Sequence, residues 1–273
     1  MWIRAYYTTT SAGWLFAPPW CRIAAICIPP ATRQRPAGEQ PGRRSMSRFI
    51  FLVRWLVVLA LPILVTLSAA RIMVAEWYPR YEYAKPDFPP DPYGFTQAQR
   101  VELATACIRY LGRPEPAEVA IPMLRALRLP GTDKPLFAEN EISHMLDVKR
   151  FTDLLWRVHG AAAVIVIGGL AFLLGRRPSR REGYAALFRG GLMTTGLLAF
   201  LVAFVLLSWR AFFVAFHEAF FPPDTWTFDW SDSLIRLFPD RFWFDAGVLL
   251  TAGALATGAA LAAVGYALRR WAK

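Results

Sequence analysis

The chain contains only three histidines, the side chains best suited to moving protons near neutral pH. His144 lies in the segment EISHMLDVKR and His217 in AFHEAFFPPDTW, and each segment flanks a long apolar run. His159 lies about one turn inside the run that follows His144. Two imidazoles brought together could share acid–base chemistry. A structural hydrogen-bonding role is the alternative for any one of them.

The neighbours of His144 suggest how its imidazole would be held. Glu141 and Asp147 lie three positions before and after it, close to it on a helix. We expect Asp147 to orient the ring and select its tautomer, with Glu141 as a further supporting residue. Glu141-x-x-His144 also resembles half of a di-iron site, but such sites use two of these pairs. The sequence has no second pair, so no metal and no cofactor are predicted.

Three arginines lie near the same ends of apolar runs as the histidines: Arg71, Arg157 and Arg210. Together they suggest a polar pocket for carbonyl, phosphate or carboxylate oxygens, and they are candidate substrate-binding residues. Snorkelling of each side chain toward the membrane surface is the alternative. Arg210 and His217 are seven positions apart, so they share a face if one helix contains both.

These residues must be positioned by membrane-spanning helices. The chain is 55% hydrophobic with a mean hydropathy of +0.31, and its apolar residues are concentrated in blocks. Each block reaches the roughly 20 residues that a transmembrane helix needs. The sequence therefore predicts an all-α polytopic membrane protein with four transmembrane helices, at about 49–75, 154–175, 190–216 and 245–268.

The formal charge of +11 is distributed unevenly. Arginines and lysines gather before the first span, between the second and third spans and after the fourth, whereas acidic and basic residues nearly balance in 76–150. This is the positive-inside pattern of a multi-pass protein of the cytoplasmic (inner) membrane. Both termini are predicted to be cytoplasmic, with 76–150 and 217–244 on the extracytoplasmic side. The pattern also argues against nucleic acid as a partner.

Helical signals recur in the segment 76–150, which is predicted to be a small extracytoplasmic lobe. Thr96 and Gln99 have the spacing of a capping box before an amphipathic stretch. Asn140 is predicted to cap a later helix that leads into the second span. The fourth span is rich in Ala and Gly, which predicts close packing at the centre of the bundle.

The first 45 residues differ in composition from the rest. They are rich in Pro and Arg, and Met46 is followed at once by an apolar membrane-type sequence. We interpret residues 1–45 as a leader that results from a mis-assigned start, with translation beginning at Met46. The alternative is a genuine N-terminal tail. Residues 46–273 are predicted to form a single membrane domain.

The two histidine segments resemble a known family. EISHMLDVKR before the second span, and FHEAFFPPDTWTFDWSDSLIRLFPDRFW before the last, resemble the lipoprotein intramolecular transacylases, bacterial membrane proteins with four spans. The resemblance covers roughly residues 48–270. It implies that the paired histidines of the family correspond to His144 and His217. Lys149 and Trp226, in the same segments, are further substrate-binding candidates.

The resemblance also implies a reaction. The substrate would be a diacylated lipoprotein in the membrane lipid, and its sn-2 acyl chain would move to the α-amino group of its N-terminal cysteine. One histidine would act as base and the other would stabilise the oxyanion, with Asp147 favouring His144 as the base. No metal or cofactor is required. The alternative is a non-enzymatic assembly or sensor protein with a partner-binding outer lobe.

Overall fold

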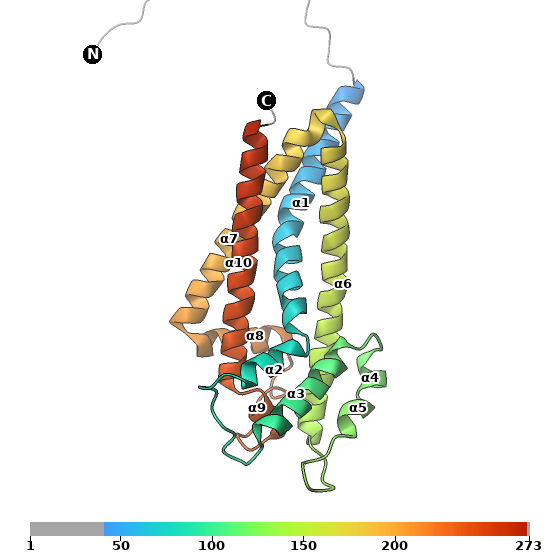
Figure 1. Ribbon diagram of the computed structural model, residues 1–273. Helices are drawn as coiled ribbons and strands as arrows, with labels where there is room; N and C mark the ends of the chain where they lie inside the picture. The colour runs from blue at the N-terminus through green and yellow to red at the C-terminus, as the bar shows by residue number, and fades with distance from the viewer. Residues whose placement is uncertain (1–40, 272–273) are drawn as a thin grey trace, which may run out of the picture. The chain divides into compact units, whose positions relative to one another are not determined.

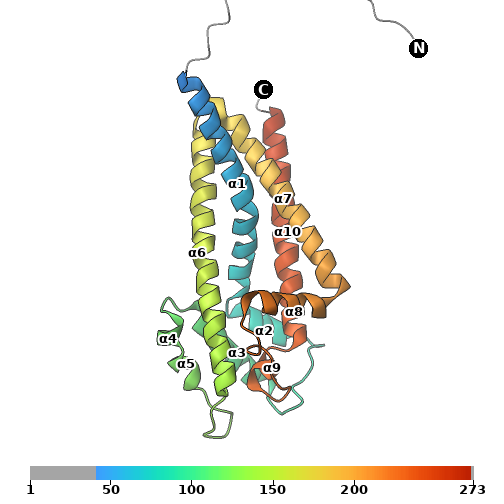
Figure 2. The same ribbon diagram turned by 180° about the vertical axis from the view of Figure 1, so that it is seen from behind.

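The computed structural model describes residues 41–271, and four long helices form its framework (Figures 1 and 2). All four are long and apolar enough to cross a membrane, which confirms the predicted all-α class and its four spans. The predicted leader lies outside the described residues except for 41–45, which begin the first helix. The four helices are α1 (Pro41–Met73), α6 (Glu139–Gly175), α7 (Arg180–Leu207) and α10 (Asp240–Trp271).

The helix α6 is much longer than the second predicted span. Its 37 residues correspond to about 55 Å, whereas the hydrocarbon layer is about 30 Å thick. The N-terminal part of α6, which includes His144, therefore projects beyond the membrane-spanning part. The prediction that Asn140 caps this helix is wrong, because the helix begins at Glu139 and Ala138 occupies the N-cap position.

The third apolar run, 190–216, is not one helix. The helix α7 ends at Leu207, and Ser208 leaves the helical conformation with φ −158° and ψ 88°. The Ser208 hydroxyl then accepts a hydrogen bond from the Ala211 N–H at 3.3 Å, capping the new helix α8 (Trp209–Phe220). In Figure 2, α8 runs across the end of the bundle at a steep angle to α7. His217 thus lies on a separate helix and not at the end of a span.

The Ala- and Gly-rich helix α10 packs closely against α7, as its composition predicts. A Cβ added to Gly191 of α7 would lie 2.5 Å from the backbone nitrogen of Ala262 in α10. The central position belongs instead to α1, which lies between α6 and α10 in both views (Figures 1 and 2). Each helix has a most apolar stretch of 18 residues, and 33% of that stretch is buried in α1 but only 22% in α10.

The lobe gathers at the end of the bundle opposite the C-terminal end of α10 (Figure 1). Thr96 and Gln99 form the predicted capping box at its largest helix, with reciprocal hydrogen bonds of 3.2 and 2.9 Å. At the other end, a short 3-10 turn (η1, Arg177–Ser179) joins α6 to α7. The lobe helices are α2 (Trp77–Tyr83), α3 (Gln97–Gly112), α4 (Ala117–Ala120), α5 (Pro122–Arg125) and α9 (Ser233–Leu237).

The lobe is built onto the projecting part of α6 and the first turns of α10. Buried residues of α3, α6 and α9 share one hydrophobic core, which includes Tyr110, Ile142 and Leu237. The Lys85 ammonium donates to Asp245 of α10 at 2.8 Å, and the Tyr78 hydroxyl donates to the Phe242 carbonyl at 2.7 Å. These two hydrogen bonds join α2 and the segment that follows it to the start of α10.

Candidate active site

The two histidines of the quoted segments meet in the structure. His144 lies in the second turn of α6 and His217 near the end of α8, and their ring centroids are 6.3 Å apart with an interplanar angle of 23°. The break at Ser208 makes this possible, because it turns α8 away from the direction of α7 and toward α6. Residues 73 positions apart in the sequence thus form one pair of facing imidazoles.

The imidazole of His144 is enclosed by aromatic rings. Its residue surface is 7% exposed, and the rings of Phe221 and Phe228 lie 5.1 and 5.4 Å from it, centroid to centroid. Within residues 41–271, its buried Nδ1 has no hydrogen-bond partner. A buried polar atom without a partner costs free energy, and such atoms are often part of a functional site. His144 is therefore ready to form a hydrogen bond that the folded chain does not provide.

The imidazole of His217 has a defined tautomer. Its Nδ1 lies 2.8 Å from the Phe213 carbonyl oxygen, which can only accept a hydrogen bond, so Nδ1 carries the proton. In the neutral ring, the lone pair is then on Nε2. Burial lowers the pKa of His217 from its ordinary value of 6.5, while the hydrogen bond to Phe213 opposes the shift. His217 is thus neutral at pH 7, with a nitrogen able to accept a proton.

The segment after α8 turns back to cover the site. Pro222 to Thr225 form a turn in which the Thr225 hydroxyl donates to the Pro222 carbonyl at 2.8 Å. Asp224 has φ +62°, a left-handed conformation that Asp tolerates better than most residues. The reversal places the Trp226 ring 5.0 Å from the His217 ring, so this predicted substrate-binding candidate does lie at the histidine pair.

Glu141 supports the site through the backbone and not through His144. Its buried carboxylate accepts hydrogen bonds from the Ala138 N–H and the Leu234 N–H, each at 2.7 Å. The first bond satisfies the start of α6, since Ala138 has no side-chain oxygen to act as a cap. The second joins α6 to α9. Glu141 therefore fixes the segment that carries the rings around His144.

Asp147 and Lys149 have partners other than the histidine pair. Asp147 accepts a hydrogen bond from Arg150 at 3.1 Å instead of orienting His144, whose Nδ1 is left without a partner. Lys149 is fully buried, and its ammonium donates to Asp153 and, at 2.9 Å, to the Arg113 carbonyl. Asp147 thus pairs within α6, and Lys149 joins Asp153 of α6 to the Arg113 carbonyl at the end of α3.

The three predicted arginines, Arg71, Arg157 and Arg210, are all exposed. The Arg71 guanidinium lies 5.2 Å from the Trp156 ring centroid. Among the described residues, none of the three makes a hydrogen bond to His144 or His217. The third histidine, His159, has its Nε2 2.9 Å from the Ser68 hydroxyl, a contact that joins α6 to α1.

The sequence interpretation missed the aromatic enclosure of the site. Phe221 is 7% exposed and packs against both histidines. Phe228 and Phe213 also belong to the enclosure, since their ring centroids lie 5.4 Å from His144 and 4.0 Å from His217, respectively. The sequence did contain a signal for this enclosure, because Phe221 and Phe228 both lie in the segment that resembles the family. Across 41–271, no three His, Cys, Asp or Glu side chains converge in a way that could hold a metal ion.

The chain is similar to proteins of one family over most of its length. A family model described as lipoprotein intramolecular transacylase Lit matches residues 53–243. An uncharacterized protein of Aquifex aeolicus (strain VF5) is 30% identical over 201 residues, which are 74% of this chain and 87% of the relative. The matched segment contains α6, α8 and the loop between α8 and α10, and therefore both histidines.

Solved structures share the fold. The lipoprotein intramolecular transacylase Lit from Bacillus cereus superposes with a TM-score of 0.67 and 23% identity, over 83% of this chain and 96% of that one. A form of the same protein with one histidine replaced by arginine gives a TM-score of 0.62 and 22% identity, over 85% and 96% of the two chains. At this identity the likeness concerns the fold: four spans and an attached helical lobe.

Proposed function

Because the chain belongs to the lipoprotein intramolecular transacylase family, we propose that it moves an acyl chain within a diacylglyceryl lipoprotein. The family is one of acyltransferases, so the chain is an enzyme and not the assembly or sensor protein of the alternative hypothesis. In the proposed reaction, the sn-2 acyl chain leaves its glyceryl oxygen and forms an amide with the N-terminal cysteine of the same lipoprotein. The product is a lyso-form lipoprotein.

The observation that carries this proposal is the facing pair of imidazoles, 6.3 Å apart, at the lobe end of a membrane-embedded bundle. The amine and the ester already belong to one molecule, so holding them in the reactive geometry supplies much of the rate enhancement. The remaining needs are a base for the amine and a hydrogen-bond donor for the oxyanion. Two imidazoles provide both.

The structure favours His217 as the base, which reverses the assignment based on Asp147. His217 Nε2 would take a proton as the amine nitrogen attacks the ester carbonyl carbon. A neutral His144, bearing its proton on one ring nitrogen, would donate a hydrogen bond to the carbonyl oxygen. The tetrahedral intermediate then breaks its C–O bond to the glyceryl oxygen, and that oxygen receives the proton held by His217. Atoms and charge balance without a cofactor.

Mass spectrometry of N-terminal lipopeptides tests this function directly. A bacterial host that makes diacylglyceryl lipoproteins should gain lyso-form species, with an acylated cysteine amine, when the chain is expressed. A host with the empty vector should not. Unchanged lipopeptides at normal membrane abundance of the chain would refute the proposed reaction. Hydrolysed lipopeptides that have lost the acyl chain entirely would indicate acyl transfer to water instead.

The pH dependence of turnover should reflect the lowered pKa of His217. The base form is present above that pKa, so the fall in kcat that is due to protonation of His217 should be centred below pH 6.5, apart from the titration of the substrate α-amino group at pH ~8. The same shift makes the folded state lose stability as pH falls, because the unfolded chain binds the proton more readily. The folded fraction is therefore measured at each pH as the control. A single decline centred at pH ~8, with no further fall in kcat below pH 6.5, would contradict this assignment.

We further propose that the lobe and the histidine pair face the extracytoplasmic side, with both termini in the cytoplasm. The arginine-rich turn between α6 and α7 and the C-terminal end of α10 lie at the opposite end of the bundle (Figure 1), which fits the positive-inside rule. In a background with the native cysteines replaced by alanine, a membrane-impermeant maleimide should label Pro90→Cys and Ser231→Cys in intact cells. Arg181→Cys should react only after permeabilisation. Labelling of Arg181→Cys in intact cells would overturn this orientation.

A further inference from the structure

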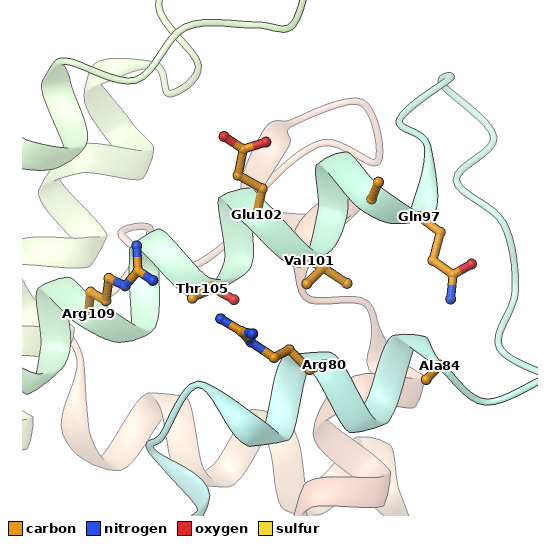
Figure 3. A pocket seen from close by; sticks show the side chains of 8 residues that line it. Arg80, Ala84, Gln97, Val101, Glu102, Thr105 and Arg109 are labelled. Carbon is orange, nitrogen blue, oxygen red and sulfur yellow. The ribbon is translucent and has the colours of Figure 1, made fainter.

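We propose that the groove between α2 and α3 binds a phosphate group, and that this phosphate belongs to the headgroup of an anionic phospholipid. The groove has a volume of about 600 Å³ (Figure 3). Its polar lining consists of Arg80 from α2 and Gln97, Thr105 and Arg109 from α3, with Glu102 at its edge. None of these residues belongs to the histidine site, so the inference does not depend on the transacylation.

Thr105 is the first observation that indicates a ligand. The residue is 4% exposed, and its hydroxyl has no hydrogen-bond partner within residues 41–271. In Figure 3 its side chain lies on the face of α3 that is turned toward Arg80 of α2. A buried hydroxyl without a partner is unfavourable. An acceptor oxygen placed in the groove would remove this cost.

The two arginines supply the charge. Glu76 accepts from Arg109 Nε and Nη2 at 2.6 and 3.0 Å and from Arg80 Nη2 at 3.1 Å, so it holds both guanidinium groups at the groove. The Nη1 atom of each arginine makes no hydrogen bond to the described residues. Figure 3 shows the Glu102 carboxylate directed away from α2. Glu76 and Glu102 equal the two arginines in number, but only Glu76 contacts them, so each guanidinium keeps a free N–H that can donate to phosphate oxygens.

The place of the groove indicates the source of the phosphate. The helix α1 ends at Met73 and α2 begins at Trp77, so α2 lies directly outside the first span. Trp77 and Tyr81 are 42% and 48% exposed, and their ring centroids are 6.0 Å apart. Exposed Trp and Tyr side chains are typical of the headgroup region. Arg80 lies on the same short helix, so it can reach the phosphates of the same headgroup region.

The test measures thermal unfolding of the full-length protein in detergent, because a ligand that binds the folded state raises the midpoint temperature. The probes are dioctanoyl phosphatidylglycerol, dioctanoyl phosphatidylcholine and inorganic phosphate. Phosphatidylglycerol should raise the midpoint saturably and more than phosphatidylcholine does. Arg80→Gln removes a charged donor and should raise the half-saturating concentration about tenfold, and Thr105→Val should raise it about fivefold. Thr105→Ser should restore the original value.

Arg125→Gln is the matched control, because Arg125 pairs with the exposed Glu139 elsewhere on the lobe. It should bind phosphatidylglycerol like the unchanged chain. Equal responses to phosphatidylglycerol and phosphatidylcholine would overturn the assignment to an anionic headgroup. Saturation by inorganic phosphate at the same concentration would assign the groove to free phosphate and overturn the lipid source. No saturable shift, or an unchanged half-saturating concentration in both Arg80→Gln and Thr105→Val, would refute the site.

Discussion

Replacing either His144 or His217 by alanine should eliminate detectable lyso-form lipoprotein while leaving the chain folded in the membrane. Loss of a general acid or base typically lowers a rate by about 10²- to 10⁴-fold, and His217 is the group with a free Nε2 to accept the proton. His144 lies beside it, and its Nδ1 has no partner among the described residues, so its imidazole is available to bind the oxyanion. Lipopeptide mass spectra at matched membrane abundance measure the effect.

Two matched variants separate catalysis from general damage. His159→Ala removes the same side chain from the same helix, but His159 contacts Ser68 of α1, so most activity should remain. Asp147→Asn should be close to unchanged, because Asp147 pairs with the exposed Arg150 and not with His144. Full conversion by His144→Ala or by His217→Ala would remove that histidine from the mechanism. A loss of the same size in His159→Ala would place the chemistry elsewhere.

Glu141→Ala should have the second-largest effect, acting on stability and activity together. The Glu141 carboxylate accepts two backbone N–H bonds while only 2% exposed, and hydrogen bonds to a charged group each contribute about 1.5–3 kcal/mol. Removing the carboxylate leaves the buried Leu234 N–H without a partner and releases α9 from α6. We expect a loss of about 3 kcal/mol or more in the free energy of unfolding. Conversion should fall at least about tenfold, because a small displacement of groups around a reacting centre is costly.

The control for Glu141→Ala lies two positions away. Glu139 is in the same first turn of α6, but it is exposed and pairs only with Arg125, and such surface pairs contribute about 0–1 kcal/mol. Glu139→Ala should therefore remain stable and active. Glu141→Gln should be intermediate, since its amide has one accepting oxygen for two N–H groups. The prediction fails if Glu141→Ala and Glu139→Ala unfold at the same temperature and convert substrate equally.

Hydropathy and local capping rules were sufficient for the framework of the molecule. The thickness of the bilayer sets the length of an apolar run, so all four spans could be placed from composition alone. The capping box of Thr96 and Gln99 depends on residues three positions apart, and it formed as predicted. Both depend on interactions within one segment, which is why no knowledge of the rest of the chain was needed.

Hydropathy and local capping rules did not predict the break between α7 and α8 at Ser208. The run 190–216 stays apolar throughout, and neither Pro nor Gly marks the end of α7 at Leu207. A hydropathy scale reports burial in an apolar medium, not the direction of a helix axis. The change of direction is supported by contacts to other segments: Trp209 packs 5.6 Å from the Phe244 ring of α10, and Phe220 packs 4.7 Å from the Phe151 ring of α6.

The sequence by itself therefore determined the class, the four spans, the helical lobe and the two segments that carry His144 and His217. Only the tertiary structure decided how the polar groups are paired. Asp147 lies three positions after His144 on α6, but its carboxylate accepts a hydrogen bond from Arg150 instead. The Glu141 carboxylate accepts a hydrogen bond from the backbone N–H of Leu234, 93 positions away in the sequence. Hydrogen-bond partners are selected by which distant segments pack together, and that selection is a property of the whole fold.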